Sequence, residues 1–312
     1  MIRRNDHGDG ETRGPRPRDD PACVRLLTCP VCQEPLGRVG RSLRCATGHS
    51  YDVARQGYVD LLPAGHGRST ITGDTTDMIR ARRRFLDAGH YEPLTSAVAR
   101  KAADQLMAVA TAREPRRPVA LDAGCGDGSY LGAVARLTAA GKGTAPATGT
   151  STCFFGLDVA RPAIRLAAGR HKQALFFRND VRHRICLADD SVDLLLNVFA
   201  PRNPREFRRV LRPDGMLLVV VPGDEHLAQL RDCLPLLDIP QDKRDQTVAA
   251  LAPGFRPAGE ERVEHDLELD DVALTDLLRM TPSAWHLDDA RIADAAGLAP
   301  IHVTASFHML VF

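Results

Sequence analysis

Three cysteines and one histidine near the N-terminus have the spacing of a metal site. Cys29, Cys32, Cys45 and His49 follow the pattern C-x2-C-x12-C-x3-H. Zinc prefers four sulfur or nitrogen ligands in a tetrahedron, and two tight turns that each carry a ligand pair supply that geometry. The surrounding segment 23–63 is too short to form its own core, so a metal ion would stabilise it. The pattern predicts one structural zinc with a closed ligand shell; the alternative is two unrelated cysteine-bearing turns.

A glycine-rich loop at 124–128 is the second candidate site. Gly124, Gly126 and Gly128 follow an apolar run and precede a helical pattern. Glycines let the backbone turn sharply and approach a ligand closely, and the N-terminus of a helix offers free N–H groups. The next apolar run ends in Asp158, where a carboxylate can accept hydrogen bonds from ribose hydroxyls. We therefore expect a nucleotide-type ligand; the other reading of Asp158 is a cap for the helix that follows it.

The spacing of the glycines distinguishes two classes of ligand. The loop reads G-x-G-x-G, whereas a dinucleotide pyrophosphate requires G-x-G-x-x-G. The chain also ends in an apolar run at 301–312, which suits the last strand of the seven-stranded sheet of methyltransferases. Both features favour S-adenosylmethionine over a dinucleotide.

The elements that must position these residues follow an alternating pattern. We expect strands at 119–122, 153–157, 175–178, 192–199, 216–221, 262–269 and within 301–312. We expect helices at 129–139, 161–169, 205–211, 225–237, 271–279 and 288–296, and two more within 77–112. Strands that alternate with helices predict an α/β fold, with a parallel sheet and helices on both faces.

Composition changes divide the chain into four parts. We expect a disordered tail at 1–22, a zinc-binding domain at 23–63, a linker with helices at 64–112 and a methyltransferase domain at 113–312. The tail carries too few apolar side chains to offset the entropy of ordering it. The predicted fold is therefore a Rossmann-like, seven-stranded class I methyltransferase domain with a small zinc-ribbon-like domain in front.

The overall composition excludes several classes of protein. The 312 residues carry 41 basic and 40 acidic side chains, a net charge of +1, which excludes a uniformly basic nucleic-acid coat. We find no apolar stretch of transmembrane length and no secretion signal, so we expect a cytoplasmic protein. The eight cysteines are then expected to be reduced. We expect Cys23 to be a spare thiol, and Cys153, Cys186 and Cys233 to be core residues.

Six segments carry motifs that occur together: Cys29–Cys32, Cys45–His49, Tyr51–Leu62, Ala81–Tyr91, Leu121–Gly126 and Pro222–Leu227. In combination they resemble one family, the bacterial large-subunit ribosomal RNA guanine-N1-methyltransferases. A further segment, Asn197–Pro204, resembles the actinomycete branch that includes the tylosin and mycinamicin resistance methyltransferases. The resemblance extends over about residues 25–312, and in combination the motifs are specific.

The resemblance implies a reaction and a partner. It implies transfer of a methyl group from S-adenosylmethionine to N1 of a guanine in a 23S rRNA hairpin near the peptide exit tunnel, with macrolide resistance as the outcome. It also implies that the zinc domain helps to hold the hairpin, and it favours a homodimer. Together with the glycine loop, it predicts cofactor contacts at Tyr91, Asp122, Gly124, Gly126, Gly128, Tyr130, Leu131, Asp158 and His226. The segment 179–184 matches weakly, so no adenine contact is assigned there.

The proposed reaction needs an acceptor for a proton. Guanine N1 carries a hydrogen that must leave, and Asp180, Asn197 and His226 are the candidate catalytic residues. No one of them is singled out as a general base. The target base must leave its stack to enter the site. Phe199 and Trp285 are candidates to stack on it, although core packing is the commoner role of such residues.

Charge is distributed unevenly along the chain. Residues 23–100 carry eleven basic and seven acidic side chains, whereas residues 101–312 carry 25 and 28. We therefore expect RNA phosphates to dock mainly on the N-terminal part. Arg80, Arg82, Arg83 and Arg84 are candidates for these contacts; the alternative is a solvated helix face.

Two other classes of function remain open at this point. One is a small-molecule methyltransferase in which the zinc module serves as a lid or substrate domain, and the other is a non-catalytic zinc-ribbon RNA-binding protein. Basic helices beside a zinc module disfavour the former. The intact set of loop glycines and Asp158 disfavours the latter.

Overall fold

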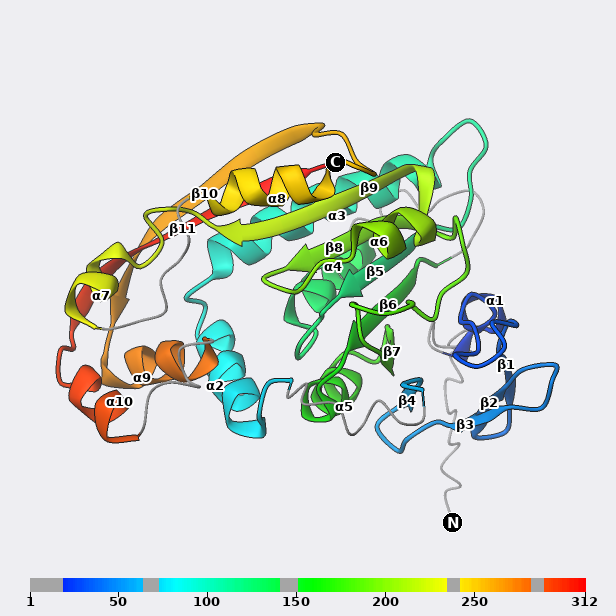
Figure 1. Ribbon diagram of the computed structural model, residues 1–312, viewed down its shortest axis with the longest axis horizontal. Coiled ribbons are helices and arrows are strands. Elements are labelled where there is room, and N and C mark those ends of the chain that lie inside the picture. Colours follow the sequence, from blue (N-terminus) through cyan, green and yellow to red (C-terminus); the bar gives the residue numbers. More distant parts are fainter. Residues whose placement is uncertain (1–18, 64–72, 141–150, 235–241, 282–288) are drawn as a thin grey trace, which may run out of the picture.

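A single large sheet runs through the molecule (Figure 1). The computed structural model describes residues 19–63, 73–140, 151–234, 242–281 and 289–312. Within them the sheet has eight strands in the order β10-β11-β9-β8-β5-β6-β7-β4. The strands are β4 (Tyr58–Asp60), β5 (Val119–Ala123), β6 (Cys153–Asp158), β7 (Leu175–Arg178), β8 (Val192–Val198), β9 (Leu211–Pro222), β10 (Gly259–Leu269) and β11 (Ile301–Val311).

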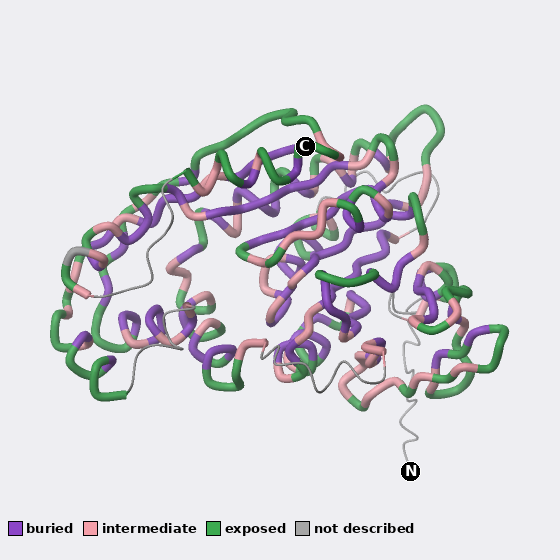
Figure 2. The backbone as a smooth tube through the Cα atoms, in the orientation of Figure 1, coloured by how far each residue is buried: buried purple, intermediate pink, exposed green. Residues whose placement is uncertain are grey.

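The strand directions are those of a Rossmann-like methyltransferase sheet. β5 pairs in parallel with β6 and β8, β6 with β7, and β8 with β9. β11 is antiparallel to both β9 and β10. The seven strands predicted from the sequence are all present, and the class I methyltransferase fold is confirmed. The central strands β5 and β8 are buried at every position, as Figure 2 shows, because layers cover both faces of the sheet.

Alternate side chains of each strand enter two separate apolar layers. Leu194 and Leu196 of β8 pack with α3 (Glu92–Ala110), α4 (Ser129–Ala140) and α5 (Arg161–Arg170) on one face. Leu195 faces the other layer, with α6 (Pro204–Val210) and α8 (Lys243–Leu251). In the parts of the chain that are described, no helix is both long and apolar enough to cross a membrane.

The remaining helices lie at the ends of the sheet. They are α1 (Pro21–Val24), α2 (Thr76–Asp87), α7 (Ala228–Cys233), α9 (Asp271–Met280) and α10 (Asp289–Ala296). Most predicted elements lie within a few residues of these bounds. α8 was not predicted, and the helix expected at 225–237 is the short α7, with residues 235–237 outside the described parts of the chain.

The zinc module shares the core of the catalytic domain. It contains a three-stranded sheet of β1 (Gly37–Val39), β2 (Ser42–Arg44) and β3 (Ser50–Asp52), and it supplies the eighth strand, β4, to the large sheet. β4 pairs in parallel with β7. Leu27, Leu36 and Leu43 of the module lie in the same apolar layer as β8 and α6. A segment too small to bury its own apolar surface thus buries it against the sheet.

The last residues of the predicted tail are part of this packing. Asp20 caps α1 by accepting a hydrogen bond from Ala22 N–H, and its other oxygen pairs with Arg117 at 2.5 Å. The predicted tail therefore extends too far at its C-terminal end. The rest of the prediction falls on residues 1–18, outside the described residues.

Two predictions about the cysteines are wrong. Cys23 and Cys153 form a disulfide, with Cα atoms 5.6 Å apart, because α1 packs beside the start of β6. The two residues are 130 positions apart in the chain, so local patterns could not pair them. Cys233 is exposed on the short α7, whereas Cys186 is buried as expected.

We predict that the buried carboxylate of Asp193 is a strong determinant of stability. It is fully buried, accepts a hydrogen bond from Val119 N–H at 2.8 Å and pairs with Arg116 at 2.6 Å. Asp193→Ala leaves Val119 N–H without an acceptor and Arg116 with only the exposed Asp214, and it should lower the free energy of unfolding by about 3 kcal/mol. Asp214 pairs with the same arginine but is 64% exposed, so Asp214→Ala should cost at most about 1 kcal/mol. Urea unfolding measures both changes, and equal losses would contradict the role of burial.

Candidate active site and metal centre

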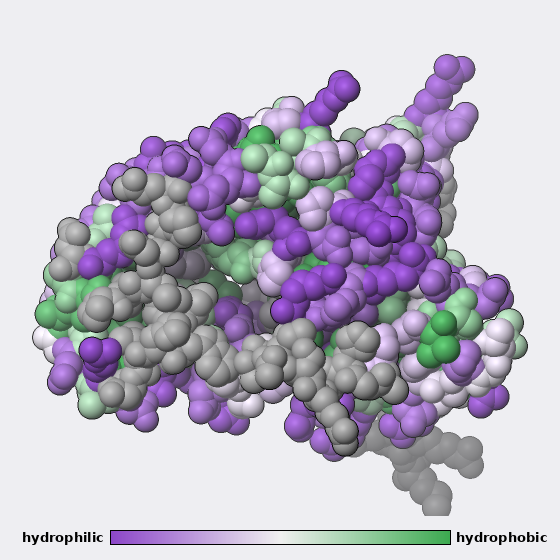
Figure 3. All heavy atoms as spheres, in the orientation of Figure 1, coloured by the Kyte–Doolittle hydropathy of each residue, from purple (hydrophilic) through white to green (hydrophobic). Residues whose placement is uncertain are grey.

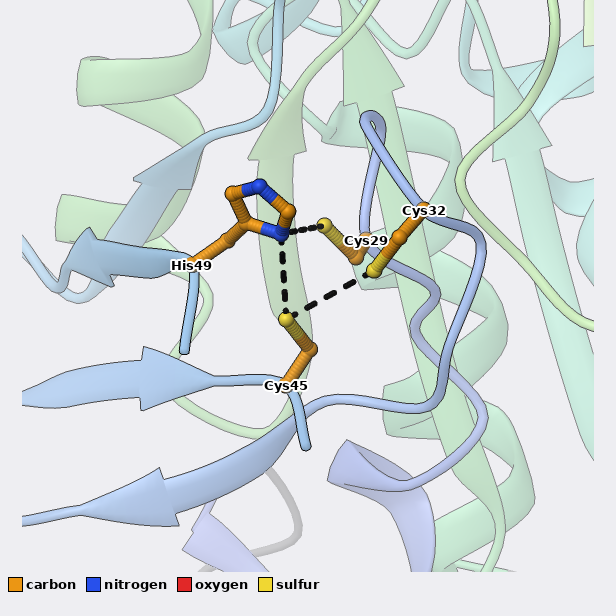
Figure 4. Close-up of side chains that lie close together, drawn as sticks. All are labelled: Cys29, Cys32, Cys45 and His49. Carbon is orange, nitrogen blue, oxygen red and sulfur yellow. Dashed lines mark hydrogen bonds between the residues drawn. The ribbon is translucent and has the colours of Figure 1, made fainter. Parts of the chain in front are cut away.

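The four predicted metal ligands lie together (Figure 4). Cys45 Sγ is 3.6 Å from Cys32 Sγ and 3.4 Å from His49 Nδ1, and Cys29 Sγ is 3.6 Å from His49 Nδ1. All four ligand atoms lie within 4.8 Å of one another. Zinc–sulfur bonds of about 2.3 Å give a tetrahedron with edges of about 3.8 Å. The cluster therefore has the size and the donor atoms that a zinc ion requires.

Two tight turns bring these ligands together. Cys29 and Cys32 lie in one turn, where Gln33 has a φ of 64°, and Gly48 has a φ of 92° between Cys45 and His49. Hydroxyl groups surround the cluster. Thr47 Oγ1 is 3.1 Å from Cys32 Sγ and 3.0 Å from Cys45 Sγ, and Tyr51 Oη is 3.1 Å from Cys29 Sγ. Such outer groups stabilise thiolate charge and orient ligands. Thr47 and Tyr51 were not predicted from the sequence, because a threonine or a tyrosine has no ligand spacing of its own.

The glycine loop follows β5 and requires its glycines for two reasons. Gly124, Gly126 and Gly128 have φ values of 89°, 55° and 78°, in the left-handed region that side chains disfavour. Space is also limited: a Cβ atom on Gly124 would lie 2.4 Å from the Cβ of Ala200. The loop that follows β8 is therefore packed directly against the glycine loop.

Asp158 connects the glycine loop to the end of β6. Its Oδ2 accepts a hydrogen bond from Gly126 N–H at 2.9 Å, and its Oδ1 accepts one from Ala160 N–H at 2.8 Å. Ala160 is itself the N-cap residue of α5, so the alternative that Asp158 caps this helix is wrong. A carboxylate has about four acceptor sites. Asp158 can therefore accept further hydrogen bonds from a ligand.

Three carboxylates give this loop a negative environment. Asp122, Asp127 and Asp158 lie on or next to it, and burial, together with the charges of the other two, raises the pKa of Asp122 to about 8. Within the described residues, the buried Oδ2 of Asp122 has no hydrogen-bond partner. This environment opposes the negative pyrophosphate of a dinucleotide. It suits S-adenosylmethionine, whose sulfonium and amino groups are positive.

Arg82 belongs to this loop and not to an RNA-facing surface. It pairs with Asp74 and donates to Met280 O at 2.8 Å, and its Nη1 would be 3.6 Å from a Cβ on Gly126. Arg84 pairs with the buried Asp276 of α9 at 2.5 Å, although its own side chain is 57% exposed. The expectation of an RNA contact is therefore wrong for Arg82, whereas for Arg84 it stays a prediction. Packing of α2 against α9, which the sequence does not reveal, decides their direction.

Arg80 and Arg83 remain on the outer face of α2. Their side chains are 67% and 46% exposed, and each pairs with an acid of the same helix, Asp77 and Asp87. The alternative reading of a solvated helix face thus describes these two arginines.

Tyr91 and His226 meet in an aromatic cluster at the end of the sheet. Tyr91 Oη is 3.5 Å from His226 Nε2, and both rings contact Phe307, with centroids 5.0 and 4.7 Å away. Ser306 N–H donates to His226 Nδ1 at 3.3 Å, which places the ring proton on Nε2. Burial lowers the pKa of His226 to about 3. His226 is therefore a neutral donor whose basic nitrogen is occupied, and it is unsuited to be a general base.

The other two catalytic candidates are also engaged. Asp180 is buried; burial alone would raise its pKa, but hydrogen bonds from Arg182 outweigh this and hold the pKa below its usual range. Asn197 donates from Nδ2 to Ala123 O and Pro201 O, both at 3.0 Å, and thereby attaches the loop after β8 to the end of β5. The structure brings Asn197 to the glycine loop as a positioning residue.

The remaining predicted residues have simple positions. Leu131 is fully buried in the first turn of α4, and Tyr130 is partly buried against the same core. Trp285 lies outside the described residues. Phe307 was not predicted as a site residue, because an apolar strand gives no sign of which of its side chains will face a ligand.

Zinc removal tests the metal centre. Cys45→Ser should lower the zinc content well below one ion per chain and unfold the module, because structural zinc contributes ~10–16 kcal/mol in comparable peptides. Cys233 is exposed and lies outside the cluster, so Cys233→Ser should retain the full zinc content. Elemental analysis and limited proteolysis measure the two effects. Full zinc content in Cys45→Ser would show that these side chains do not form the site.

Comparisons with known proteins agree with this geometry. The zinc-ribbon family model described as "RlmA, N-terminal" matches residues 27–70. A protein of Micromonospora griseorubida assigned by name to the 23S rRNA guanine-N(1) methyltransferases is 44% identical, over 93% of this chain and 97% of its own. The 23S rRNA (guanine(748)-N(1))-methyltransferase of Streptomyces fradiae is 41% identical, over 91% of this chain and 96% of its own.

A more distant relative lies outside the actinomycetes. A protein of Bacillus subtilis, also assigned by name to the 23S rRNA guanine-N(1) methyltransferases, is 31% identical over 92% of this chain and 96% of its own. These values, together with the zinc cluster and the methyltransferase sheet, confirm the family predicted from the sequence. The chain belongs to the 23S rRNA guanine-N1 methyltransferases, which are S-adenosylmethionine-dependent enzymes, and it carries one structural zinc.

Proposed function

We propose that this enzyme methylates a guanine in a hairpin of 23S rRNA near the peptide exit tunnel and thereby confers macrolide resistance. The observation that carries the proposal is the 41% identity to the Streptomyces fradiae enzyme, whose name specifies guanine 748. The resemblance of segment 197–204 to the actinomycete branch supports the same target. We also propose that it works in the cytoplasm as a homodimer, which the resemblance to the family favours.

The residues at the carboxyl edge of the sheet would share the work of holding the cofactor. Asp158 would accept the ribose hydroxyls, and Asp122 would face the positive amino group. Tyr91 and His226 would line the space beside the sulfonium methyl group. The remaining contacts would come from Gly124, Gly126, Gly128, Tyr130 and Leu131. The aromatic cluster and the three acids support this division, because one end of the site is apolar and the other is negative.

A groove on the zinc module is the surface that suits RNA phosphates best. Arg38, Arg41 and Arg55 line it, between the β1–β2 hairpin and β4. Arg38 pairs with Asp19, whereas Arg41 and Arg55 are exposed and have no acidic partner among the described residues. Exposed arginines without counter-ions can exchange their solvent ions for phosphates. We assign the docking of the hairpin to this groove.

Asp158→Ala tests the cofactor site. The change removes an acceptor for the ribose, so S-adenosylmethionine should bind about 10- to 100-fold more weakly. Asp104→Ala removes an exposed carboxylate of α3 and should leave the affinity unchanged. Calorimetry measures both, with thermal unfolding as the check on folding. Equal affinities in the two variants would place the ribose elsewhere.

The function itself is tested on 23S rRNA. Wild-type enzyme and S-adenosylmethionine should produce a reverse-transcription stop at one guanine, because N1 methylation removes a Watson–Crick donor. Arg41→Glu/Arg55→Glu should weaken RNA binding and reduce the slope of its salt dependence by about one per lost phosphate contact. The position of the stop should not change, because phosphate contacts orient the substrate and the base pocket selects it.

A matched pair of arginines provides the control. Arg113 and Arg136 are also exposed but lie on the catalytic domain, so Arg113→Glu/Arg136→Glu should leave the salt slope unchanged. No stop with wild-type enzyme would reject guanine N1 in this RNA as the target. Equal slopes in the two double variants would reject the groove while leaving the target intact.

A further inference from the structure

The loop after β8, residues 199–203, occupies the position where a second substrate would meet the cofactor. β5 and β8 are neighbours in the sheet. After β5 the chain adds β6 and β7 on one side of this pair, and after β8 it adds β9 on the other side. Ligands of open α/β sheets bind at such a point, outside the carboxyl ends of the strands. Ala200 packs against Gly124, so the loop borders the glycine loop. Figure 3 shows a hollow surface at this edge, between the ends of β8 and β9 and helices α2 and α9.

The loop is held rigidly at both ends. Asn197, near the end of β8, donates one hydrogen bond to Ala123 O of β5 and one to Pro201 O of the loop, both at 3.0 Å. At the other end, Asn203 donates to Arg182 O at 3.2 Å and caps α6 by accepting from Glu206 N–H. A loop fixed in this way presents its middle residues in a constant geometry.

Phe199 has a backbone conformation that is unusual for a large side chain. Its φ is 51°, which a side chain of this size rarely adopts, and it remains 45% exposed. Its ring centroid is 5.5 Å from that of Phe307, which contacts Tyr91 and His226. Backbone strain of this kind is concentrated at functional sites. The exposed ring of Phe199 thus extends the aromatic cluster of Tyr91, His226 and Phe307 towards solvent.

Arg202 is the one charged side chain of this loop, and it has no partner among the described residues. It is partly buried, and burial lowers the pKa of its guanidinium with no opposing effect from a carboxylate. The nearby charges are already paired: Asp180 with Arg182, and Glu206 with Arg209 at 2.6 Å. His183, 52% exposed, lies 3.8 Å from Asp180. A partly buried cation without a counter-ion lowers the stability of the fold unless a ligand supplies hydrogen-bond acceptors or negative charge to it.

We propose that Phe199 stacks on the target guanine and that Arg202 binds its O6 and N7 atoms. An aromatic face and a guanidinium fork together match a flat base with two adjacent acceptors, and the arginine–guanine pair is the commonest base-specific contact. Contact on this edge leaves N1 free to face the methyl group. Arg202 is then both a specificity-determining and a catalytic residue.

The positive charge of Arg202 would assist the methyl transfer. Guanine N1 loses its proton to water, and the electron pair left on N1 is shared with O6 as negative charge. N1 then attacks the methyl carbon, the carbon–sulfur bond breaks, and its electron pair returns to sulfur, which becomes a neutral thioether. A guanidinium at O6 stabilises the charge before the methyl group arrives. This assistance is needed because His226 and Asp180 are unsuited to take the proton.

Arg202→Gln tests the proposal against Arg205→Gln, an equal loss of charge at an exposed position on α6. We expect Arg202→Gln to lower kcat on 23S rRNA about 100-fold near neutral pH. Its activity should recover as pH rises, because hydroxide can then ionise guanine N1 without the cation. Affinity for S-adenosylmethionine and thermal stability should match those of wild type. Arg205→Gln should behave as wild type throughout.

Two further measurements separate the role of Arg202 from other roles. RNA with 7-deazaguanine at the mapped position should be a poorer substrate for the wild-type enzyme. It should not lower the remaining activity of Arg202→Gln, because this variant no longer has the arginine that contacts N7. Phe199→Ala should raise KM, and Phe199→Tyr should restore it.

Three results would overturn the proposal. Unchanged activity and an unchanged pH profile in Arg202→Gln would remove the arginine from the site. A loss of cofactor affinity would assign it to S-adenosylmethionine. A changed salt dependence with an unchanged pH profile would assign it to a phosphate of the RNA.

Discussion

Strand β5 pairs in parallel with β6 on one side and with β8 on the other, and the chain leaves all three strands at the same edge of the sheet. This pairing brings together segments that are far apart in sequence: the glycine loop, Asp158 and the loop at 199–203. The contact between Gly124 and Ala200 leaves no room for a side chain, so the two loops form one surface. The glycine loop, Asp158 and the loop at 199–203 therefore lie together at this edge.

The electrostatics of the edge follow from the same arrangement. Burial raises the pKa of Asp122, and the nearby charges of Asp158 and Asp127 raise it further. Arg82, drawn inward by Asp74 and the C-terminus of α9, partly offsets them. Under the proposed function, a cationic cofactor would relieve the remaining repulsion. The aromatic cluster around Phe307 would then supply an apolar surface beside the methyl group that is transferred.

The zinc module depends on the sheet as much as on its metal. Its apolar side chains enter the layer that covers one face of the sheet, and β4 extends the sheet beyond β7. The Cys23–Cys153 disulfide joins the same two parts. The described part of the module is therefore joined to the catalytic domain by strand pairing, apolar packing and a disulfide, and under the proposed function these contacts would fix the position of a bound RNA relative to the active site.

The sequence by itself determined the features that depend on neighbours along the chain. The ligand spacing of Cys29 to His49, the glycine loop, the seven strands and the helices between them are all local patterns, since hydrophobic periodicity and turn residues act over a few positions. Family motifs added the reaction and the cofactor for the same reason. Residue types at given spacings carry that information without any contact being known.

Only the tertiary structure decided which side chains meet across the fold. It turned Arg82 inward, paired Arg84 with Asp276 of α9, joined Cys23 to Cys153 and added β4 to the large sheet. It also occupied the basic nitrogen of His226 with Ser306 and left Arg202 without a partner within the described parts of the chain. Each outcome depends on a residue distant in sequence. Whether an arginine or a histidine is paired, buried or free to act is set by such neighbours, and a linear pattern does not contain them.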